Sequence, residues 1–125
     1  MKRCAALALL LGAGATLAAP PALGTYAASL CVAPITEPER VPNCGPADVV
    51  WARRGRARVQ VNDIAYRLTL YSRQLDVLLM HGAMQIDEFK APFEWDGSTL
   101  KFSDADKGLR YEVRIGERRL ASAPR

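Results

Sequence analysis

The residue best suited to acid–base chemistry near neutral pH is the only histidine of the chain, His81. As a general base it would need a carboxylate to orient its ring, and Asp76 and Asp87 are the nearest in the sequence. A turn at His81-Gly82 would instead expose the ring and leave it without an orienting partner. Because no Gly-x-Ser-x-Gly nucleophile elbow or free cysteine nucleophile accompanies it, we expect a protein that is not an enzyme. A small envelope hydrolase that uses His81 is the alternative.

The spacing Asp104-x-Asp106-x-Gly108 resembles the start of a calcium-binding loop. A calcium loop of the helix–loop–helix type has glycine at its sixth position and glutamate at its twelfth. Here the glycine is fifth and the twelfth residue is Ile115. The pattern therefore predicts a hairpin turn and no metal site.

Four carboxylates, Asp87, Glu88, Glu94 and Asp96, form a local acidic group. Paired carboxylates about 5–10 Å apart across a cleft can hydrolyse glycosides. A domain of this size leaves little room for such a cleft, so a solvated hairpin face is the favoured interpretation. No phosphate-binding loop or dinucleotide fingerprint occurs, and we expect no cofactor.

Arginines cluster around the turn that follows Trp51. Arg53, Arg54, Arg56 and Arg58 would form a basic hairpin tip beside that aromatic ring. Guanidinium groups bind phosphates and carboxylates well. These five residues are therefore the candidate binding patch, for the phosphates of lipopolysaccharide, another polyanion or an acidic protein.

The first 27 residues have the layout of a secretory signal peptide. Lys2 and Arg3 precede an apolar run that ends near Ala19, and Pro20-Pro21 and small residues follow. We expect cleavage between about 24 and 28. An uncleaved anchor is the alternative, but the run is shorter than the roughly 20 residues that a spanning helix needs. No later segment is long enough to span a bilayer, so the mature form should have no transmembrane segment.

An exported chain meets an oxidising compartment, where an even pair of cysteines forms a disulfide. Cys4 would leave with the leader, so Cys31 and Cys44 should be bonded. In the chain-entropy model a loop of this length gains roughly 3 kcal/mol. Three prolines fall between the two cysteines, and the segment 28–46 is therefore expected to be irregular.

The residues 47–117 are predicted to form one β domain, because apolar residues alternate with polar ones between short turns. In the first hairpin Val49 should face Val59, and Trp51 should face Ala57, around a three-residue loop that Gly55 closes. Tyr111, Val113 and Ile115 should face the core of the last strand, with Arg110, Glu112 and Arg114 in water. The tail 118–125 should be loose and basic.

Two hairpins leave alternatives open. Around Asp96-Gly97, a two-residue turn would set Phe93 against Leu100, whereas a longer loop would set it against Phe102. Both registers keep the aromatic face separate from the charged face.

The second hairpin with alternatives is the segment 74–89. It can form a hairpin at His81-Gly82 with Val77 against Ile86, or it can contain a helix near 73–82. The hairpin is favoured although it would set Asp76 against Asp87, which is unfavourable.

The expected fold class is mainly β: a small antiparallel meander or barrel of about seven or eight short strands. The helix near 73–82 would make it α+β. We expect a binding or inhibitory module of the bacterial envelope, in the periplasm or secreted, whose partner is a protein or an anionic envelope component rather than nucleic acid. A structural subunit of an envelope assembly is a further alternative, and it would require an unpaired edge strand.

Overall fold

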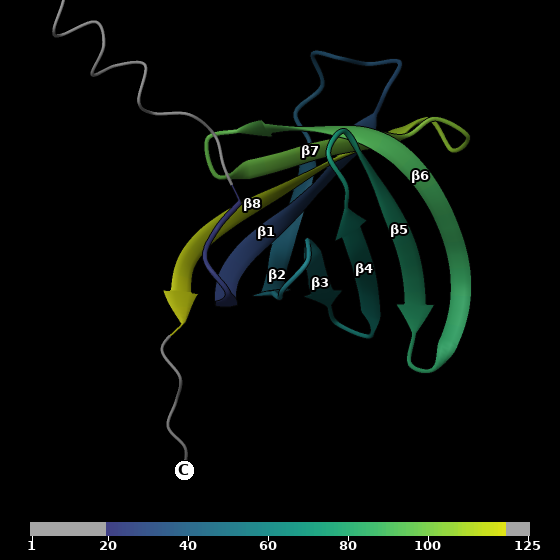
Figure 1. Ribbon diagram of the computed structural model, residues 1–125. Helices are drawn as coiled ribbons and strands as arrows, with labels where there is room; N and C mark the ends of the chain where they lie inside the picture. Colours follow the sequence, from purple (N-terminus) through teal and green to yellow (C-terminus); the bar gives the residue numbers. More distant parts are fainter. Residues whose placement is uncertain (1–19, 120–125) are drawn as a thin grey trace, which may run out of the picture.

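The computed structural model describes residues 20–119, which form eight β-strands (Figure 1). The first 19 residues of the expected leader and the end of the chain from residue 120 lie outside the described residues. No helix in the described part of the chain is long and apolar enough to cross a membrane. The strands are β1 (Gly24–Pro34), β2 (Asn43–Trp51), β3 (Arg56–Val61), β4 (Ile64–Leu70), β5 (Gln74–His81), β6 (Met84–Asp96), β7 (Thr99–Asp104) and β8 (Leu109–Arg119).

Each strand pairs antiparallel with the next, and β8 returns to pair with β1, so the sheet is a closed barrel. The predicted β class and barrel are confirmed. The helix expected as an alternative near 73–82 is absent, because those residues form β5. Alternate residues of β5, such as Leu75 and Val77, are fully buried, which is the period of a strand rather than of a helix.

The register of the first predicted hairpin is confirmed. Val49 pairs with Val59 and Trp51 with Ala57. Gly55 closes the turn with a φ of 71°, and a Cβ built there would lie only 2.5 Å from the carbonyl oxygen of Leu70. Glycine is required both by the backbone conformation and by this close approach.

The predicted register of the β5–β6 hairpin is wrong. Val77 faces Phe89 rather than Ile86, because the pairing shifts between Leu79 and Met80. A β-bulge adds one residue to one strand and increases the local twist. It also lets Phe89 join the buried aromatic residues while Ile86 remains exposed.

The shifted register removes the expected clash between Asp76 and Asp87. Asp76 instead faces Lys90, and Nζ of Lys90 lies 3.2 Å from its carboxylate. Asp87 accepts a hydrogen bond from Lys107 in the β7–β8 turn. Opposite charges directly across a ladder stabilise it, which favours this pairing over the predicted one.

The β6–β7 hairpin adopts the second of the two registers. Phe93 pairs with Phe102 and Glu94 with Lys101, around a turn at Gly97-Ser98. Gly97 has a φ of 64°, the left-handed region that favours glycine.

The prediction that the segment 28–46 is irregular is wrong. This segment forms most of β1 and the start of β2. Only residues 35–42 lie between these strands. Pro34 ends β1, and the expected boundary at 27/28 falls inside that strand. The first buried side chain of β1 is Tyr26, which lies within the part of the chain expected to belong to the leader. Likewise, β8 continues to Arg119, so residues 118 and 119 belong to a strand rather than to the expected loose tail, whose remainder lies outside the described residues.

The predicted disulfide joins Cys31 and Cys44, which face each other in the β1–β2 ladder. The loop 35–42 extends from this point and is held by Arg110 of β8. Nη2 of Arg110 donates to the carbonyl oxygens of Glu37, Pro38 and Arg40 at 3.4, 3.3 and 2.9 Å. Arg110 lies on the outer face, as predicted, but the loop partly covers it, and its Nε is buried without a partner.

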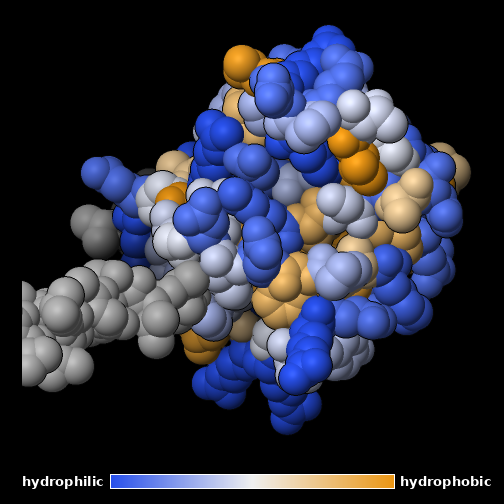
Figure 2. Space-filling model, turned by 90° about the horizontal axis from the view of Figure 1, so that it is seen from above, coloured by the Kyte–Doolittle hydropathy of each residue, from blue (hydrophilic) through white to orange (hydrophobic). Residues whose placement is uncertain are grey.

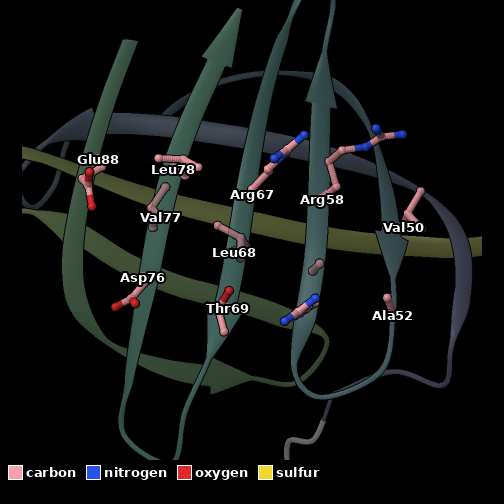
Figure 3. A pocket seen from close by; sticks show the side chains of 12 residues that line it. Val50, Ala52, Arg58, Arg67, Leu68, Thr69, Asp76, Val77, Leu78 and Glu88 are labelled. Carbon is pink, nitrogen blue, oxygen red and sulfur yellow. The ribbon is translucent and has the colours of Figure 1, made fainter. Parts of the chain in front are cut away.

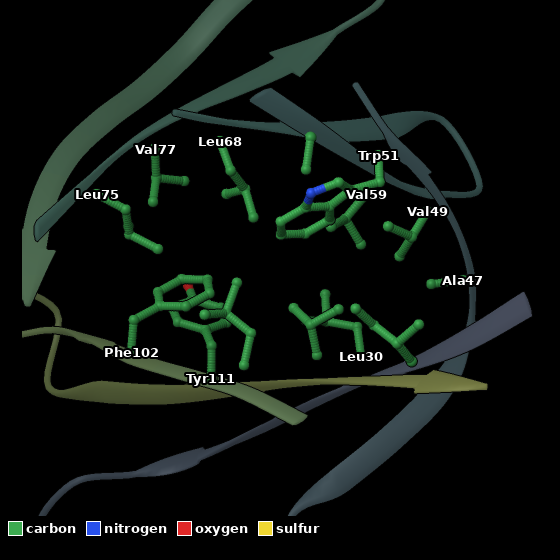
Figure 4. Packing of buried hydrophobic residues seen from close by; sticks show 14 of the residues in the cluster. Leu30, Ala47, Val49, Trp51, Val59, Leu68, Leu75, Val77, Phe102 and Tyr111 are labelled. Carbon is green, nitrogen blue, oxygen red and sulfur yellow. The ribbon is translucent and has the colours of Figure 1, made fainter. Parts of the chain in front are cut away.

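Buried side chains from all around the sheet fill the interior (Figure 4). Trp51 lies beside Val49 and Val59, and Phe102 and Tyr111 point toward them from the opposite wall. Phe102 and Tyr111 stack with their ring centroids 5.3 Å apart. The barrel is therefore a packed core rather than a container, as is usual for a small barrel.

Outside the core, apolar surface remains in a few places. On the face shown in Figure 2, hydrophobic residues gather in a hollow that hydrophilic residues surround. The large hydrophobic residues that stay exposed are Leu23, Ile35, Val41, Tyr71, Met84 and Ile86. Two of them, Leu23 and Tyr71, lie at the same end of the barrel.

Replacing Tyr26 by alanine tests whether β1 begins as the structure shows. Tyr26 is buried in the core, and its hydroxyl donates to the carbonyl oxygen of Ala22 at 2.6 Å. We expect Tyr26→Ala to lower the free energy of unfolding by about 3–5 kcal/mol, the usual cost of emptying an aromatic site. Urea unfolding of the protein isolated from cells measures it.

The control for that substitution is Tyr71→Ala, at a tyrosine that is 57% exposed. It should change stability by less than about 0.5 kcal/mol. Equal stability of the Tyr26→Ala protein and its parent would contradict the placement of β1.

Alkaline pH should destabilise the fold through Tyr111, because desolvation by burial raises its pKa to about 12. An unfolded tyrosine titrates near 10, so between about pH 10 and 12 the unfolded chain binds fewer protons than the folded one. Stability is therefore complete below about pH 10 and falls as the pH rises toward 12. In Tyr111→Phe the decline over this interval should be shallower in urea unfolding; an unchanged slope would contradict the assignment.

Candidate functional site

The structure does not assemble the arrangement that a hydrolase centred on His81 would need. His81 is the exposed last residue of β5, and its side chain makes no hydrogen bond or ion pair with any described residue. Asp76 is bound by Lys90 and Asp87 by Lys107. The hydrogen bond from Lys107 lowers the pKa of Asp87, so this carboxylate is an ion-pair partner rather than a base.

The other carboxylates behave as sheet and turn residues. Asp104 is buried at the start of the β7–β8 turn, where it accepts a hydrogen bond from the backbone N–H of Lys107. Asp96 pairs with Lys101 at 3.0 Å. Residues 20–119 contain no group of three or more histidine, cysteine, aspartate or glutamate side chains that could hold a metal ion.

The candidate binding patch is divided by the fold. Trp51 points into the barrel, is only 5% exposed and packs against Trp95 with ring centroids 5.6 Å apart. It is a core residue rather than part of an exposed patch with the arginines, which corrects the expectation. The strand period explains the difference, because Trp51 is on the inward face while the residues of the turn are outside.

Arg56 and Arg58 lie on the outer face of β3, where they are joined by Arg67 of β4. These three line a groove of about 520 Å³ that runs across β2 to β6, and we call it the arginine groove (Figure 3). Its base includes the outward-facing apolar residues Val50 and Leu78.

The arginine groove has an uneven distribution of charge. Figure 3 shows Arg58 and Arg67 side by side on neighbouring strands, whereas Asp76 and Glu88 lie toward β5 and β6. Asp76 is already paired with Lys90. The cationic side of the groove is therefore open to an external anion.

Arg58 and Arg67 face each other directly in the β3–β4 ladder. Like charges in this position destabilise a sheet, by an amount similar to the roughly 0.2–1 kcal/mol that favourable pairs contribute. Neither guanidinium forms a salt bridge with any of the described residues. No ion pair among residues 20–119 therefore offsets this repulsion.

The same contrast holds over the whole described chain. Between residues 53 and 73 the sequence has a single acidic residue, Asp63. The cations with a carboxylate partner lie elsewhere: Arg40, Lys90, Lys101, Lys107, Arg110, Arg114 and Arg119. Seven described cations have none. One is Arg118, whose Nη2 donates to the carbonyl oxygen of Leu23. The other six are Arg53, Arg54, Arg56, Arg58, Arg67 and Arg73, and we call them the arginine face.

Sequence reasoning found four residues of the arginine face and missed Arg67 and Arg73. The distance between Arg58 and Arg67 along the sequence hid their contact. The signal that could have found it is the register of the β3–β4 turn at Asn62-Asp63, which sets Arg58 opposite Arg67.

The assembly hypothesis required a strand with an unpaired edge. The closed order β1 to β8 gives each strand two neighbours. Along β6, however, Met84–Pro92 pair only with β5 and Phe93–Asp96 only with β7, so part of β6 is paired on one side. The described residues also provide the feature that the binding hypothesis required, an exposed arginine patch.

Comparisons with known proteins add no family to this description. No family model, curated protein or solved structure matches the chain.

Proposed function

We propose that this protein is an exported binding module that recognises an anionic component of the bacterial envelope through the arginine face. The observation that carries the proposal is the gathering of arginines without carboxylate partners on β3, β4 and the adjoining turns, while the cations elsewhere on the barrel are engaged. Guanidinium groups bind phosphate and carboxylate oxygens in a bidentate manner, which suits such a ligand.

The cost of this arrangement supports a binding role. In most sheets, charged residues that face each other across a ladder have opposite signs. The pairs Lys90–Asp76 and Lys101–Glu94 follow this rule elsewhere in the barrel. The direct opposition of Arg58 and Arg67 makes the free protein less stable than it could be. An anion bound between the two guanidiniums would remove the repulsion.

The spacing of the arginines favours a ligand with several charges. Arg56 and Arg58 are two positions apart on one strand, roughly 7 Å, and Arg67 lies on the next strand at about 5 Å. A single small anion can contact only part of this array. A phosphorylated glycolipid or an anionic polymer can contact several of the arginines at once.

Reversing one charge in the array tests the proposal. We expect Arg67→Glu to weaken binding of lipopolysaccharide and of polyphosphate by about tenfold or more, the value of one charge-assisted hydrogen bond. The same substitution should raise the free energy of unfolding by about 0.2–1 kcal/mol, because it converts a repulsive pair into an attractive one. Titration calorimetry and urea unfolding give the two readouts.

The matched control is Arg40→Glu in the loop 35–42. It changes the net charge equally, but Arg40 forms only an exposed ion pair with Glu37. This variant should still bind lipopolysaccharide and polyphosphate. Added salt should weaken the binding, because the interaction is between exposed charges. Neutral dextran should not bind. Equal loss of affinity in both variants would show that only net charge matters and would refute a site on the arginine face.

A further inference from the structure

A second hollow, of about 480 Å³, opens at the end of the barrel that holds the β2–β3 and β4–β5 turns. We call it the barrel mouth. Its inner wall is aromatic and aliphatic: Trp51, Leu70, Phe93 and Trp95. The volume lies within the range of roughly 300–1,000 Å³ that is usual for small-molecule sites, which are mostly apolar inside.

The rim of the barrel mouth carries apolar side chains in contact with water. Leu23 is 45% exposed and Tyr71 57% exposed, and both line the hollow. Together with the half-buried rings behind them, they form continuous apolar surface rather than scattered exposed residues. Such a patch on a small domain marks a binding surface.

One wall of the barrel mouth is a strap formed by residues 20–23 before β1, so the site belongs to a mature form whose leader ends before residue 20, earlier than the cleavage expected from the sequence. The hydroxyl of Tyr26 donates to the carbonyl oxygen of Ala22 at 2.6 Å, and Nη2 of Arg118 donates to that of Leu23 at 2.6 Å. These two bonds hold the strap in place without a ligand. A site that is formed before binding loses less conformational entropy when it binds.

The barrel mouth adjoins the arginine groove. Ala52 lines both, and Arg53 and Arg54 of the β2–β3 turn lie at the border between them. Neither arginine has a carboxylate partner among residues 20–119. The apolar hollow is therefore bordered by cations on the side where it meets the arginine face.

We infer that the barrel mouth binds the alkyl chain of an anionic amphiphile, a molecule with one apolar chain and a phosphate or carboxylate headgroup. The chain lies against the two tryptophans and Phe93, and the headgroup lies against Arg53 and Arg54. Charge complementarity and the apolar lining of the open hollow together select this occupant. The inference deepens the proposed function, on which it rests for the recognition of the anionic group.

The chain provides its own probe, because Trp51 and Trp95 are its only tryptophans and both line the barrel mouth. Dodecyl phosphate below its micelle concentration should shift tryptophan emission to shorter wavelength, and a chain brominated near its end should quench it. Inorganic phosphate should do neither. Dodecanol should bind at least tenfold more weakly than dodecyl phosphate, because it lacks the charge that faces Arg53 and Arg54.

The variants place a charge on the rim without disturbing the core. Leu23→Glu combined with Tyr71→Glu should weaken the binding of dodecyl phosphate at least tenfold while leaving the circular dichroism spectrum and thermal unfolding unchanged. Val41→Glu is the matched control, since Val41 is 84% exposed in the loop 35–42 at the other end of the barrel. It should bind dodecyl phosphate as the parent does.

The outcomes separate this inference from the proposed function. Polyphosphate binding that is sensitive to Arg67→Glu, without any tryptophan response to dodecyl phosphate, would overturn the amphiphile site and leave the arginine face standing. A tryptophan response that is equal for dodecanol and dodecyl phosphate would also overturn it, because the headgroup would then play no part. Dodecyl phosphate binding that the rim variant weakens, without polyphosphate binding, would support the mouth and refute the arginine face.

Discussion

The pairing of β1 with both β2 and β8 is the constraint on which the rest of the molecule depends. Without β1 the sheet would have two open edges, and the apolar stripe that begins at Tyr26 would leave the core incomplete. The disulfide ties β1 to β2 near the end of their ladder, and Arg110 fixes the loop between them from β8. Closure therefore involves a ladder on each side of β1, one covalent bond and one guanidinium.

Closure also decides where a ligand can bind. Eight strands with large inward side chains leave no room inside, so the hollows of the barrel lie on its outer wall and at its mouth. The outer wall of β3 and β4 is where the fold tolerates uncompensated charge, because Arg58 and Arg67 lie on the outer face and neither pairs with an acidic residue across its ladders. Elsewhere cross-strand ion pairs use the carboxylates that could have neutralised them.

The arginine groove and the barrel mouth adjoin each other, and the first is cationic whereas the second is apolar. They share Ala52, and the β2–β3 turn places Arg53 and Arg54 between them. Gly55 makes this possible, since its positive φ and its close contact with Leu70 press the turn against the end of β4. Stability and binding are in tension here, because the repulsion that weakens the free barrel is what a bound anion would relieve.

The sequence by itself determined the β class, the cystine, the first hairpin and four members of the arginine face, because strand period and turn residues are local signals. Only the tertiary structure decided the rest. β1 was hidden because it closely follows the apolar run that predicts a leader, and the shift at Leu79 and Met80 depends on aromatic packing and on Lys90 and Lys107. Trp51 lies in the core and Arg67 lines the groove, which the sequence did not predict. Whether a side chain faces inward or meets a neighbour across a ladder is fixed by pairing between distant residues, and spacing along the chain does not contain that information.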